Sequence, residues 1–336
     1  MRYNMIKSIR ETPGILKNLK IGEEVERILE NDFNRVIFIG CGSSYFSSLA
    51  GAYVLNKVSD IQSSAFPASE FMFHFAKMAK NSLVIASSRS GNTAEVVEAI
   101  KVAKQEKATV VGVTCNGNSA ITELADIVIA AENAEEPNIP ATKSFSAITY
   151  ILQKIAIKLA HAEEMEREIE KIPDVIKNML KNEERYRELA KRLAEKDAFI
   201  HLGSGSGYIA ALEGALKIRE TTYTLNEVFP ALEFRHGPMA LTNHGNKFGY
   251  FIIAPKAIGF DAILRLLEEI KHLNPILITN LSCEYSNTIQ IPWQGDESLI
   301  LIPAVLPFQI IAYYISVYRG YNPDYPKKLV KFVDRF

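Results

Sequence analysis

The segment Ser82–Thr93 reads Ser-Leu-Val-Ile-Ala-Ser-Ser-Arg-Ser-Gly-Asn-Thr, and it predicts a strand, a turn and the start of a helix. Its apolar run Leu83–Ile85 is typical of a short buried strand. The apolar residues Val96, Val97 and Ile100 then follow at helical spacing. The turn between strand and helix presents free backbone N–H groups at a helix N-terminus, which is a place that favours an anion.

Hydroxyl side chains are concentrated in this turn. The hydroxyl residues are Ser87, Ser88, Ser90 and Thr93, and Gly91 lies among them. Ordinary N-capping uses a single hydroxyl, so two interpretations stay open, plain capping and a phosphate or phosphosugar site. The turn lacks the Gly-Lys-Ser/Thr ending of a nucleotide-binding loop and the spaced glycines of a dinucleotide site, which disfavours nucleotides.

The composition is that of a soluble globular protein, with 48% hydrophobic and 23% charged residues in 336. A net charge of −1 gives no electrostatic reason to expect nucleic acid as a partner. The three cysteines, Cys41, Cys115 and Cys283, lie far apart, and no histidine has metal-ligand spacing. We therefore expect a cytoplasmic protein without disulfides, metal or cofactor. The first residues do not resemble a signal peptide.

One uncharged stretch, residues 298–318, is long enough to cross a bilayer. Pro303 and Pro307 interrupt it. We predict a buried strand over Leu299–Ile302 and a buried helix over Phe308–Val317, and no membrane partner.

Strands alternate with helices along the first half of the chain. Predicted strands cover residues 35–39, 62–66, 83–87, 109–113 and 127–131, and predicted helices cover 45–58, 70–80, 93–105, 120–124 and 142–160. This order predicts an α/β fold with a parallel sheet between helices. Ligands of such sheets bind beyond the carboxyl ends of the strands, where the turns 42–45 and 87–93 fall.

The same pattern begins again after residue 197. Gly203 and Gly205 match Gly40 and Gly42 at a common offset of 163. Further matches pair residues 251–254 with 83–86 and residues 276–279 with 110–113. We predict a tandem duplication. Its expected parts are a helical arm (1–33) broken at Pro13-Gly14, a first domain (34–161), a solvated linker helix (162–196), a second domain (197–318) and a tail (319–336).

The second copy differs at the turn. Pro255–Phe260 replaces Ser88–Thr93, so its hydroxyls are gone. We therefore expect one anion site per chain, in the first copy.

Two groups of titratable residues stand out in the second half. Glu213, Lys217 and Glu220 have spacings of four and three on a predicted helix, which puts them on one face. They form either a surface ladder of ion pairs or a partly buried site with a carboxylate suited to proton transfer. His236 precedes Gly237-Pro238, and it serves either the structure of the turn or acid–base chemistry.

Several motifs together resemble one family. They are Gly42-Ser43-Ser44-Tyr45, Ser88–Thr93, Ala141-Thr142-Lys143-Ser144-Phe145, Leu212–Lys217 with Glu220, Glu233–Pro238 and Pro326–Lys331, in that order. This set resembles the isomerase half of glucosamine-6-phosphate synthase, a tandem pair of sugar isomerase (SIS) domains. The resemblance covers about residues 30 to 336, and it extends to the archaeal type of glucosamine-6-phosphate deaminase.

The resemblance implies a role for each matching residue. The implied phosphate cradle is Ser43, Ser88, Ser90 and Thr93, with Ser44 beside it. Glu220 would move a proton between C1 and C2 of the sugar, with Lys217 beside it. His236 would open the sugar ring from a neighbouring subunit of a homodimer, and Lys331 would contact the open-chain sugar. Arg89 and Ala141 fall at substrate-binding positions.

The chain departs from the family at three of these positions. Arg89 stands where the synthase has glutamine, Asn92 where it has glutamate, and Ala141 where it has serine. No N-terminal glutaminase cysteine precedes Cys41, so we expect no glutamine hydrolysis.

The expected function is deamination of glucosamine 6-phosphate to fructose 6-phosphate and ammonia, without a cofactor. Two further possibilities are a phosphosugar isomerase or fructosamine-6-phosphate deglycase, and a regulatory phosphosugar sensor.

Overall fold

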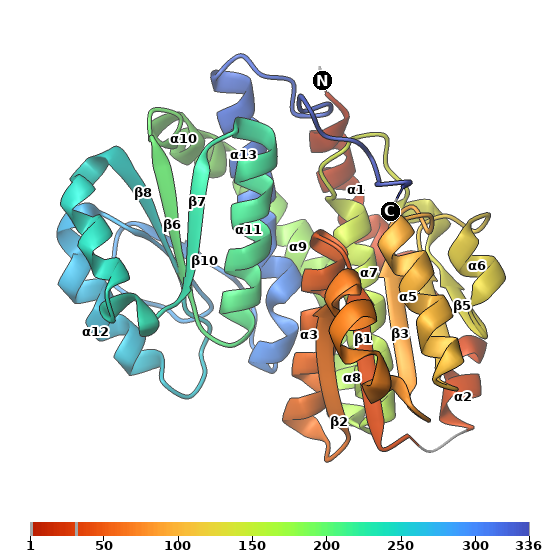
Figure 1. Ribbon diagram of the computed structural model, residues 1–336. Coiled ribbons are helices and arrows are strands. Elements are labelled where there is room, and N and C mark those ends of the chain that lie inside the picture. Colours follow the sequence, from red (N-terminus) through yellow and green to blue (C-terminus); the bar gives the residue numbers. More distant parts are fainter. Residues whose placement is uncertain (1–2, 31–32, 336) are drawn as a thin grey trace. The chain divides into compact units, whose positions relative to one another are not determined.

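The computed structural model describes residues 3–30 and 33–335, which divide into two compact units. The N-terminal unit comprises residues 11–171 together with the tail from residue 330, and the C-terminal unit comprises residues 172–329 together with those up to residue 10. Each unit contains one five-stranded sheet (Figure 1). The α/β fold predicted from the sequence is confirmed. The finer domain boundaries given above stay a prediction.

The sheet of the N-terminal unit is wholly parallel, in the order β2-β1-β3-β4-β5. Its strands are β1 (Arg35–Gly40), β2 (Gln62–Pro67), β3 (Leu83–Ser88), β4 (Thr109–Thr114) and β5 (Ile127–Ala130). The central strands β1 and β3 are almost continuously apolar and buried. Such runs are typical of parallel strands covered by helices on both faces.

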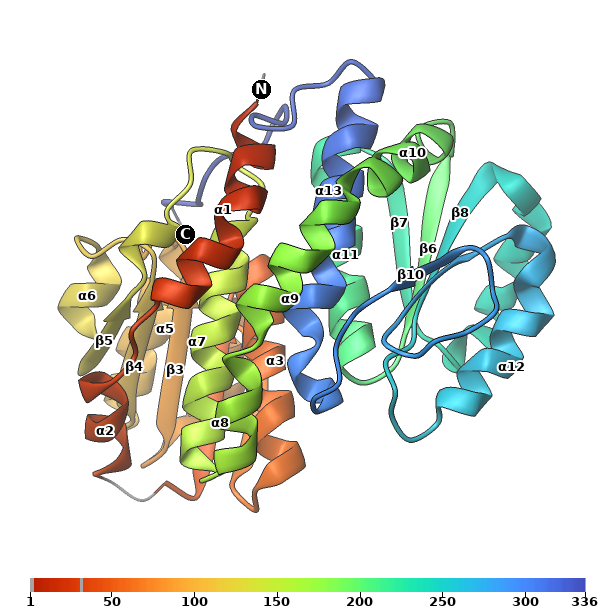
Figure 2. The ribbon, with the colours of Figure 1, turned by 180° about the vertical axis from the view of Figure 1, so that it is seen from behind.

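Helices cover both faces of this sheet (Figures 1 and 2). On one face α5 packs Val96, Ala99 and Ile100 onto Ile37 and Val84. On the other face α3 approaches so closely that a Cβ at Gly51 would lie 2.6 Å from the Phe38 ring. The regular helices are α2 (Glu23–Leu29), α3 (Ser43–Val58), α4 (Ala68–Glu70), α5 (Ala94–Gln105), α6 (Ala120–Leu124), α7 (Lys143–Leu159) and α8 (Glu163–Ile169). Shorter turns are η1 (Phe71–Phe75), η2 (Ala76–Ala79) and η3 (Glu132–Ala134).

The C-terminal unit has the strand order β10-β9-β8-β6-β7, again parallel. Its strands are β6 (Ala198–Gly203), β7 (Leu225–Pro230), β8 (Phe248–Ile253), β9 (Ile276–Thr279) and β10 (Thr288–Gln290). Its helices are α9 (Ile172–Met179), α10 (Glu183–Leu193), α11 (Ser206–Thr222), α12 (Phe260–Ile270) and α13 (Leu301–Tyr318), with the turns η4 (Leu180–Asn182), η5 (Glu233–Arg235), η6 (Pro238–Lys247), η7 (Lys271–Leu273) and η8 (Glu297–Leu299). Figure 1 shows α12 on one face of this sheet and α11 and α13 on the other.

The predicted duplication is visible in the topology, because the two strand orders are the same when β1–β5 are matched to β6–β10. Gly42 and Gly205 precede α3 and α11 with nearly equal dihedrals, φ 54° and ψ −125° against φ 56° and ψ −128°. Both lie in a region that is essentially reserved for glycine.

The predicted match of residues 251–254 with residues 83–86 is wrong by two residues. Ile39 pairs with Ala86, whereas its counterpart Leu202 pairs with Ile252, so Ala86 corresponds to Ile252 and not to Ala254. Runs of similar apolar residues do not define a unique register, which the neighbouring strand supplies. The helices α5 and α12 begin at corresponding residues, Ala94 and Phe260. In this register the second copy still lacks the hydroxyls.

Two prolines expected to lie outside helices, Pro13 and Pro307, lie within them. Helix α1 (Asn4–Asn18) continues through Pro13 and Gly14, and buried Met5, Ile9 and Leu16 lie on both sides of the proline. Proline inside a helix costs about 3 kcal/mol. Burial of several large apolar side chains at about 1.5–3 kcal/mol each outweighs that cost.

The predicted strand at Leu299–Ile302 is also absent, because these residues lie in η8 and at the start of α13. Pro303 occupies the first turn of α13, where its missing N–H costs nothing, and Pro307 lies inside the helix. The segment Glu297–Tyr318 is long and apolar enough to span a membrane, but 89% of its most apolar window is buried inside the protein. It has the character of a core helix.

Two other segments differ from expectation. Residues 70–80 are a π-helical and a 3-10 segment in place of one regular helix. Residues 162–196 form α8, α9, η4 and α10 in place of a single helix, and they bury apolar side chains such as Ile169, Ile176 and Leu189.

Candidate functional site

The hydroxyl-rich turn lies where the chain reverses its direction across the N-terminal sheet. β1 has β2 on one side and β3 on the other, so the connections after β1 and β3 run to opposite sides. Crevices at such a switch point are the usual ligand sites of open parallel sheets. Ser43 and Ser44 begin α3 directly after β1, and Ser88 ends β3. The fold therefore brings the two predicted turns to the same edge of the sheet, at this switch point.

Three of the predicted cradle hydroxyls lie against one another. Ser88 Oγ is 2.9 Å from Thr93 Oγ1 and 3.4 Å from Ser90 Oγ, and Ser90 Oγ is 3.5 Å from Thr93 Oγ1. We call Ser88, Ser90 and Thr93 the hydroxyl triad. The backbone N–H groups of Gly91 and Asn92 donate to Ser88 Oγ and Ser90 Oγ at 3.2 Å. The triad thus presents a small group of convergent O–H donors.

The capping alternative can now be examined directly. Thr93 is the N-cap residue of α5, yet its side chain makes no capping hydrogen bond. Ser87, by contrast, is fully buried and donates to the carbonyl oxygen of Ile39, so it belongs to the core. The Thr93 hydroxyl is therefore not used to cap α5, and the hydroxyl triad lies at the N-terminus of this helix, where the helix dipole favours negative charge.

Gly91 gives the turn its shape. Its φ is +67°, and a Cβ there would lie 2.0 Å from Ser119 Oγ. Asn92 fixes the turn from the next position, because its Oδ1 accepts a 2.9 Å hydrogen bond from the N–H of Ala120 at the start of α6. The departure to asparagine at residue 92 therefore has a structural role in this chain.

Arg89 contacts carbonyl oxygens of two other segments. Its Nη1 donates to the carbonyl oxygens of Asn138 and Ile139 at 3.2 and 2.8 Å, and its Nη2 donates to that of Lys331 at 2.9 Å. The Lys331 ammonium in turn lies 2.9 Å from Glu135 Oε1. The N–H of Ala94 donates to the carbonyl oxygen of Val333 at 3.0 Å. The tail is thus fastened beside the hydroxyl triad.

The loop that carries Ala141 is built around Glu136, which sequence reasoning missed. The buried Glu136 carboxylate accepts hydrogen bonds from the N–H groups of Thr142 and Ser144, at 2.8 and 3.2 Å, and from both of their hydroxyls. Asn138 donates to Glu136 Oε2 at 3.1 Å. An acid six residues ahead of a Thr-x-Ser helix start was the available signal, because helix N-termini bind carboxylates.

In the C-terminal unit, α11 buries most of the predicted charged group. The side chains of Glu213 and Lys217 are fully buried, and that of Glu220 is 20% exposed. Lys217 Nζ lies 2.7 Å from Glu220 Oε2 and 3.3 Å from Glu213 Oε1. The surface ladder of ion pairs is excluded, because Glu213 and Lys217 are fully buried. α13 covers this helix so closely that a Cβ at Gly214 would lie 2.5 Å from the Phe308 ring.

Burial lowers the pKa of Lys217, but the charges of Glu213 and Glu220 outweigh this effect, and the pKa is raised overall. Lys217 is therefore a permanent cation at neutral pH. It holds the Glu220 carboxylate in one place at the edge of the solvent-accessible surface.

Glu220 and His236 lie at opposite edges of their sheet. α11 begins at the carboxyl end of β6 and runs back, so Glu220, near its end, lies at the amino edge. His236 follows β7 and η5 at the carboxyl edge, and it is exposed. Six-residue strands are about 20 Å long, so the two side chains of one unit cannot reach the same small substrate.

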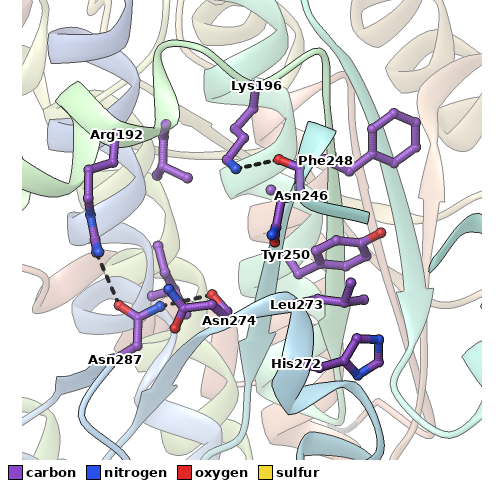
Figure 3. A pocket seen from close by; sticks show the side chains of 12 residues that line it. Arg192, Lys196, Asn246, Phe248, Tyr250, His272, Leu273, Asn274 and Asn287 are labelled. Atoms are coloured by element: carbon purple, nitrogen blue, oxygen red, sulfur yellow. Dashed lines mark hydrogen bonds between the residues drawn. The ribbon is translucent and has the colours of Figure 1, made fainter. Parts of the chain in front are cut away.

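A cavity of about 340 Å³ lies elsewhere in the C-terminal unit (Figure 3). Its lining includes Arg192, Lys196 and His272, and it reaches Phe248 and Ile276, the first residues of β8 and β9. It therefore opens at the amino edge of the sheet. None of the twelve residues that line it was a predicted site residue.

In the second copy, a carboxylate side chain occupies the N-terminus of α11, which is the counterpart of the N-terminus of α3. Ser206, the counterpart of Ser43, donates a 2.7 Å hydrogen bond to the Glu297 carboxylate, and both residues are buried. An internal carboxylate thus sits at the N-terminus of α11, in keeping with the loss of the hydroxyls there. Among the described residues, no group of three or more His, Cys, Asp or Glu side chains is placed to hold a metal ion.

Comparison with known proteins identifies the family. The model of the SIS domain matches residues 31–158 and 192–282, more than half of the chain. The chain belongs to the SIS domain family. The first matched segment contains β1–β5 and the second contains β6–β9, so the predicted tandem SIS arrangement is confirmed.

Similar SIS proteins are isomerizing glutamine–fructose-6-phosphate aminotransferases. The protein of Thermococcus kodakarensis is 32% identical over 98% of this chain, and that of Pyrococcus horikoshii is also 32% identical over 98%. The chain spans 57% of the length of each of these relatives.

Solved SIS structures match over nearly the full length. Glucosamine-6-phosphate deaminase from Thermotoga maritima is 27% identical with a TM-score of 0.78, over 98% of this chain and 99% of its own. Tagatose-6-phosphate ketose/aldose isomerase from Escherichia coli has a TM-score of 0.82 at 22% identity, over 95% of each chain, which shows a shared fold. The proteins that this chain resembles thus include aminotransferases, a deaminase and, by fold alone, a ketose/aldose isomerase.

Proposed function

We propose that this chain is a glucosamine-6-phosphate deaminase, which converts glucosamine 6-phosphate and water into fructose 6-phosphate and ammonia. The observation that carries the proposal is the hydroxyl triad at the switch point, which is not used for capping. The match to the Thermotoga maritima deaminase over 99% of that chain supports the choice of reaction.

The proposal assigns the phosphate group to the N-terminal unit. Ser88, Ser90 and Thr93 donate their hydroxyls to the phosphate oxygens, with Ser43 and Ser44 at the adjoining turn. The N-terminus of α5 adds favourable electrostatics. Binding energy from the non-reacting phosphate then helps to hold the reacting carbons in place.

Groups of the C-terminal unit carry out the proton transfers. Once the ring is open, the Glu220 carboxylate takes the proton from C2 and returns it to C1, while the aldehyde oxygen at C1 gains a proton and the amine at C2 loses one. The sugar is then an imine at C2, and water hydrolyses the C=N bond to a ketone and ammonia. Lys217 keeps Glu220 in position through their 2.7 Å contact. General acid–base steps of this kind contribute typically about 10²–10⁴-fold.

His236 is proposed to open the pyranose ring in a second copy of the chain. The support is its exposure and its place at the sheet edge opposite Glu220. A homodimer is therefore part of the proposal. Lys331 is proposed to contact the open-chain sugar, which requires its amine to leave the ion pair with Glu135. No cofactor takes part in this scheme, and a cytoplasmic location remains a prediction.

A coupled assay for ammonia and fructose 6-phosphate tests the reaction. We expect turnover with the intact chain, and a loss of at least 10²-fold in Glu220→Gln with retained binding of fructose 6-phosphate. Glu268→Gln, which removes an exposed carboxylate on α12, is the matched control and should keep full activity. Sugar-phosphate binding without any ammonia release would refute deamination.

Isomerisation is the second candidate, supported by the isomerizing aminotransferases at 32% identity. Conversion of fructose 6-phosphate into an aldose phosphate, without ammonia release from glucosamine 6-phosphate, would select it. Release of a free amine from a fructosamine 6-phosphate would instead select a deglycase. Binding without any turnover would favour a phosphosugar sensor.

A further inference from the structure

The Arg89 guanidinium makes its hydrogen bonds with backbone carbonyl oxygens and not with the hydroxyl triad. Arg89 lies between Ser88 and Ser90, whose hydroxyls approach within 3.4 Å of each other. Its guanidinium is instead occupied by the carbonyl oxygens of residues 138, 139 and 331.

These contacts join three segments that are far apart in the sequence. Arg89 belongs to the hydroxyl-rich turn 87–93. Residues 138 and 139 lead to Ala141, and residue 331 is the lysine of the tail. A guanidinium suits this task because its planar fork directs several N–H groups at once, whereas a glutamine amide has only two N–H donors. The departure from the family's glutamine at residue 89 therefore supplies donors that a glutamine lacks.

A second contact fastens the tail to the same turn. The Val333 carbonyl oxygen accepts from the N–H of Ala94, the first residue of α5. The tail backbone on both sides of Phe332 is thus tied beside the hydroxyl triad. Residue 331 is one step beyond Val330, where the chain enters the N-terminal unit.

We propose that Arg89 is a positioning residue. It fixes the tail backbone at Lys331 to the hydroxyl-rich turn and does not itself bind phosphate. The purpose of this placement, to hold the Lys331 amine for the sugar, rests on the proposed function. Phosphate binding at the triad and the position of Lys331 are then linked through one side chain.

Hydrogen exchange tests the structural part without any turnover. In Arg89→Gln we expect the amide of Ala94, whose N–H donates to the carbonyl oxygen of Val333 in the tail, to exchange at least tenfold faster than in the wild type. Arg35→Gln is the matched control, because Arg35 begins β1 at the other edge of the sheet and donates to one carbonyl oxygen, that of Met78. Unchanged exchange at Ala94 in Arg89→Gln would overturn the proposal, whatever reaction the chain catalyses.

Binding of inorganic phosphate separates positioning from direct binding. We expect Arg89→Gln to bind phosphate within twofold of the wild type. A tenfold or larger loss would make Arg89 a phosphate ligand and overturn the proposal.

Kinetics of the deaminase reaction test the link to Lys331. We expect Arg89→Gln to lower kcat with little change in KM, and the Arg89→Gln, Lys331→Ala double variant to be no slower than Lys331→Ala alone. Additive losses in the double variant would contradict action through Lys331. If the wild type shows no turnover, the proposed function fails, while the exchange and phosphate measurements still decide the role of Arg89.

Discussion

The Lys217 ammonium lies 2.7 Å from the Glu220 carboxylate, and the lysine is fully buried while the glutamate reaches the surface. The same ammonium lies 3.3 Å from the buried Glu213. One cation thus pairs with a carboxylate of the core and with a carboxylate that solvent can reach. This arrangement links the stability of the C-terminal unit to the proposed chemistry.

Replacement of Lys217 by methionine should destabilise the protein. The variant leaves Glu213 buried without this cation, and breaking a buried ion pair costs about 3–5 kcal/mol. Urea denaturation measures the loss. Lys271→Met, which breaks the exposed pair with Glu268, is the control and should cost less than about 1 kcal/mol.

The same ion pair gives an expected pH dependence. The pKa of Lys217 is raised above its ordinary value of 10.5. Its stabilising contribution is therefore complete below about pH 10 and is lost as the pH rises through the raised pKa. Equal loss of stability from Lys217→Met at neutral and at strongly alkaline pH would contradict this interpretation.

Replacement of Thr93 by valine should weaken phosphate binding. The change keeps the side-chain shape and removes one O–H donor from the hydroxyl triad. A hydrogen bond to a charged group is worth about 1.5–3 kcal/mol, so we expect roughly a 10- to 150-fold weaker Kd for inorganic phosphate by calorimetry. Thr109→Val, at the first residue of β4 and the other sheet edge, should bind phosphate as the wild type does.

Replacement of Gly91 by alanine should destabilise the turn. The new Cβ would lie 2.0 Å from Ser119 Oγ at a φ of +67°, so both sterics and backbone conformation oppose it. We expect a loss of about 1–3 kcal/mol in the free energy of unfolding. Gly259→Ala, where φ is +91° and nothing lies within 4 Å of the new Cβ, should cost less. Equal costs at both sites would show that backbone conformation alone matters.

His201 should make the protein sensitive to mild acid. This fully buried histidine on β6 has its pKa lowered to about 4, first by burial and further by the charge of Arg219, while its hydrogen bond to Asn226 opposes the shift. Below the ordinary pKa of 6.5, His201 binds a proton in the unfolded chain, whereas in the folded chain it stays neutral until the pH approaches its lowered pKa.

The free energy of unfolding should therefore fall by about 3 kcal/mol as the pH drops from 6.5 to 4, through this residue alone. Denaturation across this pH range measures it. His201→Gln should flatten the profile, whereas His272→Gln, at an exposed histidine, should leave it unchanged. A His201→Gln profile as steep as that of the wild type would assign the acid sensitivity to other groups.

Local spacing was sufficient for much of this protein. The apolar run at Leu83–Ile85 predicted β3, and the spacing of Glu213, Lys217 and Glu220 predicted their common helix face. Ser88, Ser90 and Thr93 supply more hydroxyls than an N-cap requires, and this excess could be recognised in the sequence. These inferences succeed because the period of a strand or helix is a property of neighbouring residues.

The sequence alone thus determined most of the elements, the duplication, and which residue types meet at each turn. Only the tertiary structure decided that Lys217 is buried, that Arg89 reaches the carbonyl of Lys331, and that Glu136 organises the loop before α7. Only the tertiary structure also carried two helices through Pro13 and Pro307. The physical reason is that burial and side-chain partners come from segments distant in the sequence, and their packing energy can override local propensity.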